Sequence, residues 1–127
     1  MRGILILCGL ILTVGLLALG WHFLGPDLYG ENFSTEVPSV ETRLLIEKPE
    51  DFLGKTVQIE GTVRRQCLST GCYFFFLVGE KSLRIEMGDV VNKLPARESY
   101  KARVEGELGR YGDGFQFYGR AVQFTRS

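Results

Sequence analysis

The chain has 127 residues, with 15 Lys and Arg against 15 Asp and Glu, so its formal net charge is zero. This length allows one small domain, and the balanced charge argues against a strong sequence-independent nucleic-acid binder, which needs a basic surplus. The hydrophobic content of 45% argues against intrinsic disorder, and a single histidine leaves few routes to His-rich metal chemistry.

The first predicted element is a membrane helix, because residues 3–24 contain no Asp, Glu, Lys or Arg. A helix of these 22 residues spans about 33 Å and crosses a hydrocarbon core of about 30 Å. Arg2 precedes the apolar run, and Asp27 and Glu31 follow it. We therefore expect residues 1–24 to form a signal anchor in the inner (cytoplasmic) membrane, with the carboxy-terminal domain in the periplasm or outside the cell.

A cleaved signal peptide is the alternative for this segment, since Ala18-Leu19-Gly20 is a passable cleavage site. The apolar run is longer than the usual signal core, which favours an uncleaved anchor. Cys8 lies inside the run and is expected to be a small buried side chain. Residues 25–38 are rich in Gly and Pro without helical or strand period. They are predicted to be a flexible linker of about 20 Å that lifts the domain off the headgroups.

An all-β domain is predicted at residues 39–127, opened by a short helix. Ser39 is its candidate N-cap, and Pro49 should end it near Lys48. Apolar and polar residues then alternate as in half-buried strands. The predicted strands are 56–66, 72–78, 82–87, 100–110 and 115–124.

Two further features shape this prediction. Gly61 and Gly119 fall within strands and are expected to mark bends or bulges. Residues 88–97 are interpreted as a short helix or turn between the third and fourth strands. This order favours a five-stranded OB barrel, with an open sandwich or an SH3-like barrel as the main alternative.

The stretch Gly54-Lys55-Thr56-Val57-Gln58-Ile59-Glu60-Gly61-Thr62-Val63 resembles the opening strand of bacterial OB domains of the tRNA-anticodon-binding type. Residues 60–73 resemble exported bacterial OB-like proteins in which a Val-rich strand leads into Cys-x4-Cys, with Gly before the second Cys and an aromatic after it. The resemblance covers residues 50–125 and implies the fold rather than a function. One membrane helix followed by an OB barrel is also similar to the layout of the haem chaperone of cytochrome c maturation. That family attaches haem through a histidine after the barrel, and this sequence has no histidine beyond His22.

The candidate chemistry lies in Cys67 and Cys72, which flank the turn between the first two predicted strands. An oxidising exterior permits a disulfide there, and so short a loop contributes about 2 kcal/mol in the chain-entropy model. A redox-active pair normally has Cys-x-x-Cys spacing at a helix start, and no helix is predicted here. A metal site needs more ligands than two thiols. We therefore expect a structural disulfide, no metal and no cofactor.

A run of four aromatic residues, 73–76, occupies the second predicted strand. Alternation sends one pair into the core and the other outward. In OB barrels the outer face of strands two and three is the usual ligand platform, although a helix or a partner chain also covers such rings. The predicted ligand-binding residues are Tyr73, Phe75, Arg64 and Arg84.

These observations predict a noncatalytic, membrane-tethered binding or interaction module with a protein or glycan partner. The alternative is an OB-fold binder of single-stranded nucleic acid, whose affinity should be weak because 15 acidic residues offset the 15 basic ones. An enzyme is not expected, since no carboxylate pair, nucleophile with a base or phosphate loop is evident.

Overall fold

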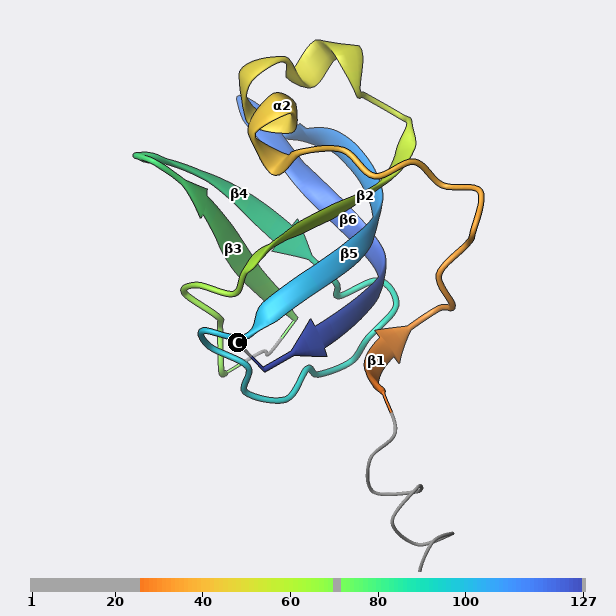
Figure 1. Ribbon diagram of the computed structural model, residues 1–127. Coiled ribbons are helices and arrows are strands. Elements are labelled where there is room, and N and C mark those ends of the chain that lie inside the picture. Colours follow the sequence, from red (N-terminus) through yellow and green to blue (C-terminus); the bar gives the residue numbers. More distant parts are fainter. Residues whose placement is uncertain (1–25, 70–71, 127) are drawn as a thin grey trace, which may run out of the picture.

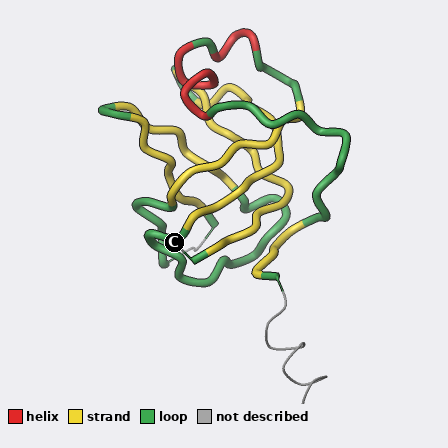
Figure 2. The backbone as a smooth tube through the Cα atoms, in the orientation of Figure 1, coloured by secondary structure: helices red, strands yellow, loops and turns green. Residues whose placement is uncertain are grey.

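The computed structural model describes residues 26–69 and 72–126 and is built mainly of strands (Figures 1 and 2). The chain order is β1 (Asp27–Gly30), α2 (Thr42–Glu47), the 3-10 turn η1 (Pro49–Asp51), β2 (Thr56–Thr62), β3 (Tyr73–Val78), β4 (Lys81–Glu86), β5 (Lys101–Tyr111) and β6 (Gly114–Thr125). The five strands predicted from the period-two pattern therefore all form. The structure ends the first of them, β2, four residues earlier than expected.

The sheet follows the order β2-β5-β6-β4-β3, and β1 adds to β6. Neighbours are antiparallel except β4 and β6, which run parallel, so the third and fifth strands of the barrel meet. This order, in a curled five-stranded sheet, is an OB-like arrangement. The sheet is not closed: β2 and β3 are the two ends of the path, and an isolated bridge between Arg64 and Phe75 links them.

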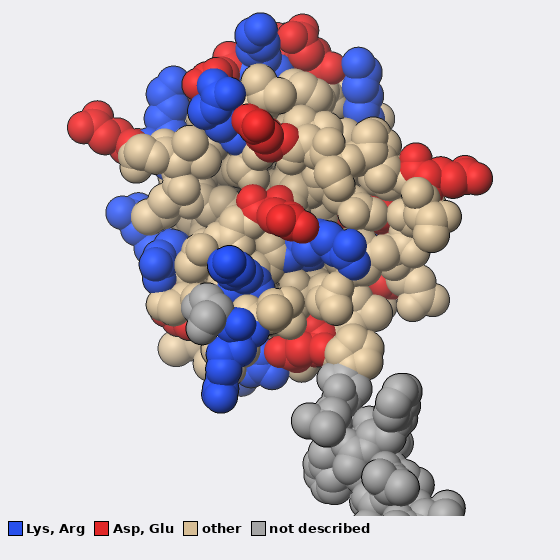
Figure 3. All heavy atoms as spheres, in the orientation of Figure 1, with Lys and Arg blue, Asp and Glu red and all other residues tan. Residues whose placement is uncertain are grey.

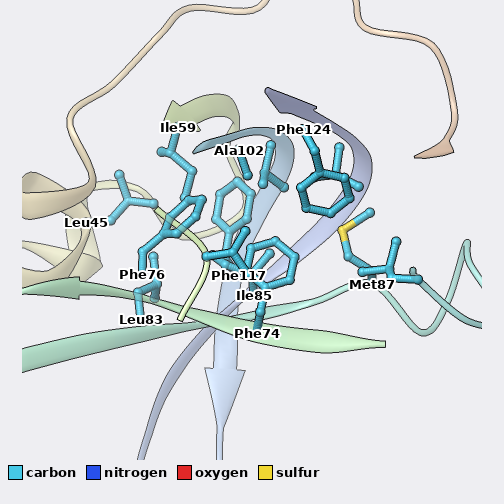
Figure 4. Packing of buried hydrophobic residues seen from close by; sticks show 14 of the residues in the cluster. Leu45, Ile59, Phe74, Phe76, Leu83, Ile85, Met87, Ala102, Phe117 and Phe124 are labelled. Carbon is cyan, nitrogen blue, oxygen red and sulfur yellow. The ribbon is translucent and has the colours of Figure 1, made fainter. Parts of the chain in front are cut away.

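The core fills the space inside the curled sheet (Figure 4). Phe74 and Phe76 point inward from β3 and are 0% and 1% exposed. Their ring centroids lie 5.6 Å apart, and Phe124 of β6 lies 6.0 Å from Phe74. Leu45 brings α2 into the same cluster, and α2 contacts β2, β3 and β4. Helix α2 thus packs on the barrel beside β2, β3 and β4.

Glycines shape two strands, as expected, but in different ways. In β6 the register shifts between Glu105↔Ala121 and Gly106↔Gly119, so Arg120 is an extra residue beside Gly119. Across Gly61 the pairing of β2 with β5 is regular, so no bulge interrupts the strand there. A Cβ on Gly61 would stand 2.6 Å from the Phe76 ring, which explains the glycine by packing instead.

Residues 88–97, interpreted as a short helix or turn, form a turn at 88–90 followed by irregular chain. Val90 and Val91 both donate to the Met87 carbonyl, giving one turn that is not continued. Pro95 and the short length of the segment prevent this turn from continuing as a helix, since a helix needs several residues beyond its nucleus. The amino-terminal helix also begins later than predicted: its N-cap is Glu41, and Ser39 instead bridges Gln58.

The segment interpreted as a linker contains β1, because Asp27–Gly30 pairs with β6. The sequence shows no period-two pattern for this strand, because only four residues form it. Within residues 26–69 and 72–126, no helix has the length and apolarity needed to cross a bilayer. The predicted membrane helix at residues 3–24, including Cys8, lies outside the described residues.

Candidate functional site

The outer face of β3 and β4 carries an aromatic and cationic surface. Because Phe74 and Phe76 fill the core, alternation leaves Tyr73, Phe75 and Leu77 on the outside of β3. The residues directly across on β4 are Glu86, Arg84 and Ser82, respectively. We call these six residues the β3–β4 outer face. Leu77 is 43% exposed, so the face is apolar and open at that end.

Arg84 lies at the centre of this face. Its guanidinium carbon stands 3.9 Å from the centre of the Tyr73 ring and 5.4 Å from that of Tyr111. It also forms an ion pair with Glu86 at 3.0 Å. A guanidinium held against aromatic rings at these distances gains cation–π attraction while its other atoms stay available for hydrogen bonds.

The predicted site residues come together unequally. Tyr73 and Phe75 pack edge to face with centroids 6.1 Å apart, and Arg84 pairs across the strands with Phe75. Arg64 adjoins Phe75 through the backbone, with reciprocal N–H to O distances of 2.9 and 2.8 Å. The Arg64 guanidinium donates to the Ser99 hydroxyl at 2.6 Å. Arg64 therefore supports the edge of the face, and its charged group is engaged with the neighbouring loop.

Two polar side-chain atoms near this face are buried without a hydrogen-bond partner among the described residues. They are the Nε of Arg84 and the Oε1 of Gln116. Phe117 pairs with Ile85, so the residues before them, Gln116 and Arg84, are neighbours on the outer side of β6 and β4. Gln116 is 4% exposed. A buried donor and acceptor left unpaired cost free energy, and their burial keeps both atoms out of reach of a partner on the outer face.

Tyr111 and Gln116 were not predicted as site residues. Tyr111 is 54% exposed at the end of β5, next to the turn that joins β5 to β6. This turn corresponds to the loop between the last two OB strands, which contributes to ligand sites in that fold. The aromatic residue beside the predicted hairpin turn was therefore a usable signal. Gln116 offered none, because its burial depends on pairing with β4 far away in the sequence.

The cysteine loop adjoins the same face. The Cys67 N–H donates to the Tyr73 carbonyl at 3.1 Å, and the Met87 N–H donates to the Cys72 carbonyl at 2.7 Å. A hydrogen bond between the Cys67 and Tyr73 side chains raises the pKa of the Tyr73 hydroxyl. Both cysteines are half-buried, and the predicted disulfide between them is not shown by the structure. Their bonding remains a prediction, and the loop is coupled to the Tyr73 ring either way.

A second polar cluster lies on the opposite side of the barrel, around Glu105. This side chain was expected on the wet face of its strand, but it is 0% exposed because residues 33–36 cover it. It accepts hydrogen bonds from the Ser34 N–H at 3.0 Å, the Gln58 amide at 2.9 Å and the Arg120 Nε at 2.7 Å. Burial opposes ionisation, but these donors outweigh it and hold the pKa of Glu105 below its usual value.

The Glu105 cluster is saturated with internal donors, so its role is to hold the amino-terminal segment on the barrel. In residues 26–69 and 72–126, no group of three or more His, Cys, Asp or Glu side chains is placed to hold a metal ion. The outer face of β3 and β4 is therefore the stronger candidate for a binding site.

Comparisons with known proteins support the fold. No protein-family model matches the chain, and a search of curated proteins finds no match. A crystal structure of an aspartyl-tRNA synthetase from Leishmania major Friedlin is similar at 15% identity and a TM-score of 0.58, over 76% of this chain and 22% of that one. The protein ygiW from E. coli is similar at 7% identity and a TM-score of 0.50, over 73% of this chain and all of that one. This chain thus matches only about a fifth of the synthetase, and likeness at such identities shows an OB-like fold alone.

Proposed function

We propose that this protein is a noncatalytic, membrane-tethered binding module whose OB-like domain faces away from the cytoplasm. In this proposal the β3–β4 outer face, together with Tyr111, holds the partner. The observation that carries it is the Arg84 corner: a guanidinium 3.9 Å from the centre of the Tyr73 ring and 5.4 Å from that of Tyr111, which is 54% exposed. Such a corner combines flat apolar contact with directional hydrogen bonding, as binding sites do.

The chemistry of this corner favours a protein or glycan partner. Sugar rings and apolar side chains both pack on aromatic faces, and hydroxyl or carbonyl oxygens accept hydrogen bonds from a guanidinium such as that of Arg84. Exposed Leu77 extends the apolar surface along β3. The Glu86 carboxylate beside Arg84 reduces the attraction for a polyanion.

The tether rests on the sequence. The uncharged run at residues 3–24 has the length and composition of a membrane helix, and Arg2 before it favours a cytoplasmic amino terminus. A domain on the outer side of that membrane meets other envelope proteins and glycans rather than cytoplasmic RNA. The disulfide predicted between Cys67 and Cys72 belongs to the same oxidising compartment.

Single-stranded nucleic acid is the second candidate. Tyr73 and Arg84 resemble the stacking pairs with which OB folds hold bases. Titration of single-stranded DNA at low salt, with Phe75→Ala as the comparison, tests it. We expect weak binding or none. Tight binding that Phe75→Ala abolishes would overturn the preference for a protein or glycan.

Site-specific photocrosslinking in cells tests the main proposal. A photoreactive amino acid at Leu77, on the β3–β4 outer face, should yield discrete adducts in membranes. The same group at Lys55, an exposed residue just before β2 and outside the β3–β4 outer face, is the matched control. Arg84→Ala should reduce the Leu77 adducts without unfolding the domain, as judged by circular dichroism. Equal adducts from both positions, or none from Leu77, would refute the assignment of this face.

A further inference from the structure

The folded domain begins almost at the end of the apolar run. Only Gly25 and Pro26 separate Leu24 from Asp27, the first residue of β1. Three peptide steps span at most about 11 Å. Because β1 is part of the sheet, no linker of about 20 Å lifts the barrel away from the anchor.

The structure also fixes which end of the barrel lies at this entry point. Asp27 pairs with Phe124 near the end of β6, and its carboxylate binds Arg97 at 2.6 Å. Gln66 binds the same loop, accepting from the Arg97 N–H at 2.7 Å and donating to the Pro95 carbonyl at 2.8 Å. We call the end formed by residues 63–69, 88–101 and 125–126 the entry end. In Figure 1 it is the lower end of the barrel.

The entry end is basic although the chain as a whole is neutral. Apart from Arg97, which Asp27 neutralises, its charged side chains are all exposed. Five are basic and two are acidic: Arg64, Arg65, Lys93, Lys101 and Arg126, against Asp89 and Glu98. In the visible face of Figure 3, Lys and Arg lie along the lower left of the barrel, and others lie at its top among Asp and Glu.

The opposite end has the reverse balance. Residues 41–55 and 107–113, which hold α2, η1 and the start of the β5–β6 hairpin, carry six acidic and four basic side chains. Arg43 there is bound by two carboxylates, Glu41 and Glu47, and Arg110 by Glu50. The net charge of zero therefore conceals a polarity along the barrel, positive toward the anchor.

We propose that the entry end docks on anionic phospholipid headgroups, so that the barrel stands on the membrane rather than hanging free from it. This rests on the membrane anchor of the proposed function. The tether keeps the entry end near the surface, within reach of its potential, which decays over about 8–10 Å. Each basic group at an anionic surface adds roughly a fivefold preference, so three net charges favour the docked state on the order of a hundredfold. The outer face of β3 and β4 then stands at the side of the domain, open to partners.

The test uses the full chain in lipid nanodiscs. A single fluorophore on each labelled chain reports how far one end of the barrel lies from the membrane surface. It is attached at Asn92→Cys on the entry end or at Asp113→Cys on the β5–β6 turn, in a chain whose three native cysteines are replaced by serine. A quencher attached to lipid headgroups provides the readout. Hydrogen exchange of residues 88–100 in the unaltered chain gives a second measurement that depends on no substitution.

We expect the Asn92 label to be quenched more than the Asp113 label in discs containing phosphatidylglycerol. The difference should shrink in phosphatidylcholine alone and at high salt. Lys93→Glu with Lys101→Glu and Arg126→Glu should abolish it. Lys48→Glu with Lys55→Glu and Lys81→Glu, all outside the entry end, changes the net charge equally and should leave the difference intact.

Equal quenching at both ends, or quenching and exchange independent of phosphatidylglycerol, would overturn the docking. A change in the Asn92 label caused by an oligonucleotide and not by lipid would overturn it too, in favour of a nucleic-acid surface. Loss of the chain from the discs during flotation would instead refute the anchor, so failures of the two proposals are distinguishable.

Discussion

Replacing Glu105 should release the amino-terminal segment from the barrel. The carboxylate is the shared acceptor for the Ser34 N–H, the Gln58 amide and Arg120, which come from three different parts of the chain. Glu105→Ala leaves all three donors without this acceptor. Glu105→Gln keeps the shape and one oxygen, but loses the negative charge.

The expected magnitude follows from burial. Breaking a fully buried ion pair costs about 3–5 kcal/mol, because the remaining partner stays unpaired. Here Glu105 is 0% exposed while the Arg120 side chain is 37% exposed, so water compensates part of the loss. We expect Glu105→Ala to lower the free energy of unfolding by about 3 kcal/mol and Glu105→Gln by about 1–2 kcal/mol. Glu107→Gln, on the exposed end of the same strand, should change it by less than about 0.5 kcal/mol.

Urea unfolding of the full chain in a mild detergent measures these changes, and limited proteolysis at residues 31–37 reports the segment. The pKa of folded Glu105 lies below its usual value, so its ionised form contributes stability above the pKa of the unfolded chain. That contribution is lost as the pH falls through the lowered folded value. The gap between wild type and Glu105→Gln should therefore be full at neutral pH and close in acid.

A gap that stays constant from neutral to acid pH would refute the role of the Glu105 charge. Glu105→Ala with unchanged stability and unchanged proteolysis at residues 31–37 would refute the tether itself. The control matters because Glu107 accepts from Thr56 at 3.1 Å and is otherwise similar in chemistry. An equal loss in both variants would mean that general strand effects dominate.

Three further predictions concern covalent state, orientation and packing. Thiol alkylation of unreduced, unfolded protein should label Cys8 alone, and labelling of Cys67 and Cys72 as well would contradict the disulfide. Protease added to spheroplasts should digest the domain, and protection by an intact membrane would contradict its orientation. Gly61→Ala should destabilise the fold by about 1–3 kcal/mol, because its Cβ would lie 2.6 Å from the Phe76 ring. Gly114→Ala, with 3.9 Å to the nearest atom, is the control in the same urea assay.

The strands could be predicted because each is long enough to show alternation against one core. In β5, Ala102, Val104 and Leu108 are buried as the pattern requires. Glu105 breaks the expectation, since the segment that covers it is not part of the sheet and its sequence has no periodic signal. β1 was missed because the four residues that pair with β6 carry too little pattern to be distinguished from a loop.

The candidate site could be predicted in part. Period two placed Tyr73 and Phe75 together, and it left open which pair of the four aromatics faces outward. The structure decides this through Phe74 and Phe76, which pack against residues remote in sequence. Tyr111 of β5 lies 5.4 Å from the Arg84 guanidinium, a contact between segments remote in sequence that no local pattern reveals.

The distribution of charge over the domain also could not be predicted from the sequence. A net charge of zero excludes a protein that binds polyanions over its whole surface, but it says nothing about how charges are divided between the ends of a barrel. The division depends on topology. Residues 63–69 and 88–101 meet because the Val63 N–H donates to the Tyr100 carbonyl and the Ser99 N–H donates to the Val63 carbonyl. This division of charge, together with the short sequence separation between Leu24 and β1, predicts which end of the domain faces the membrane.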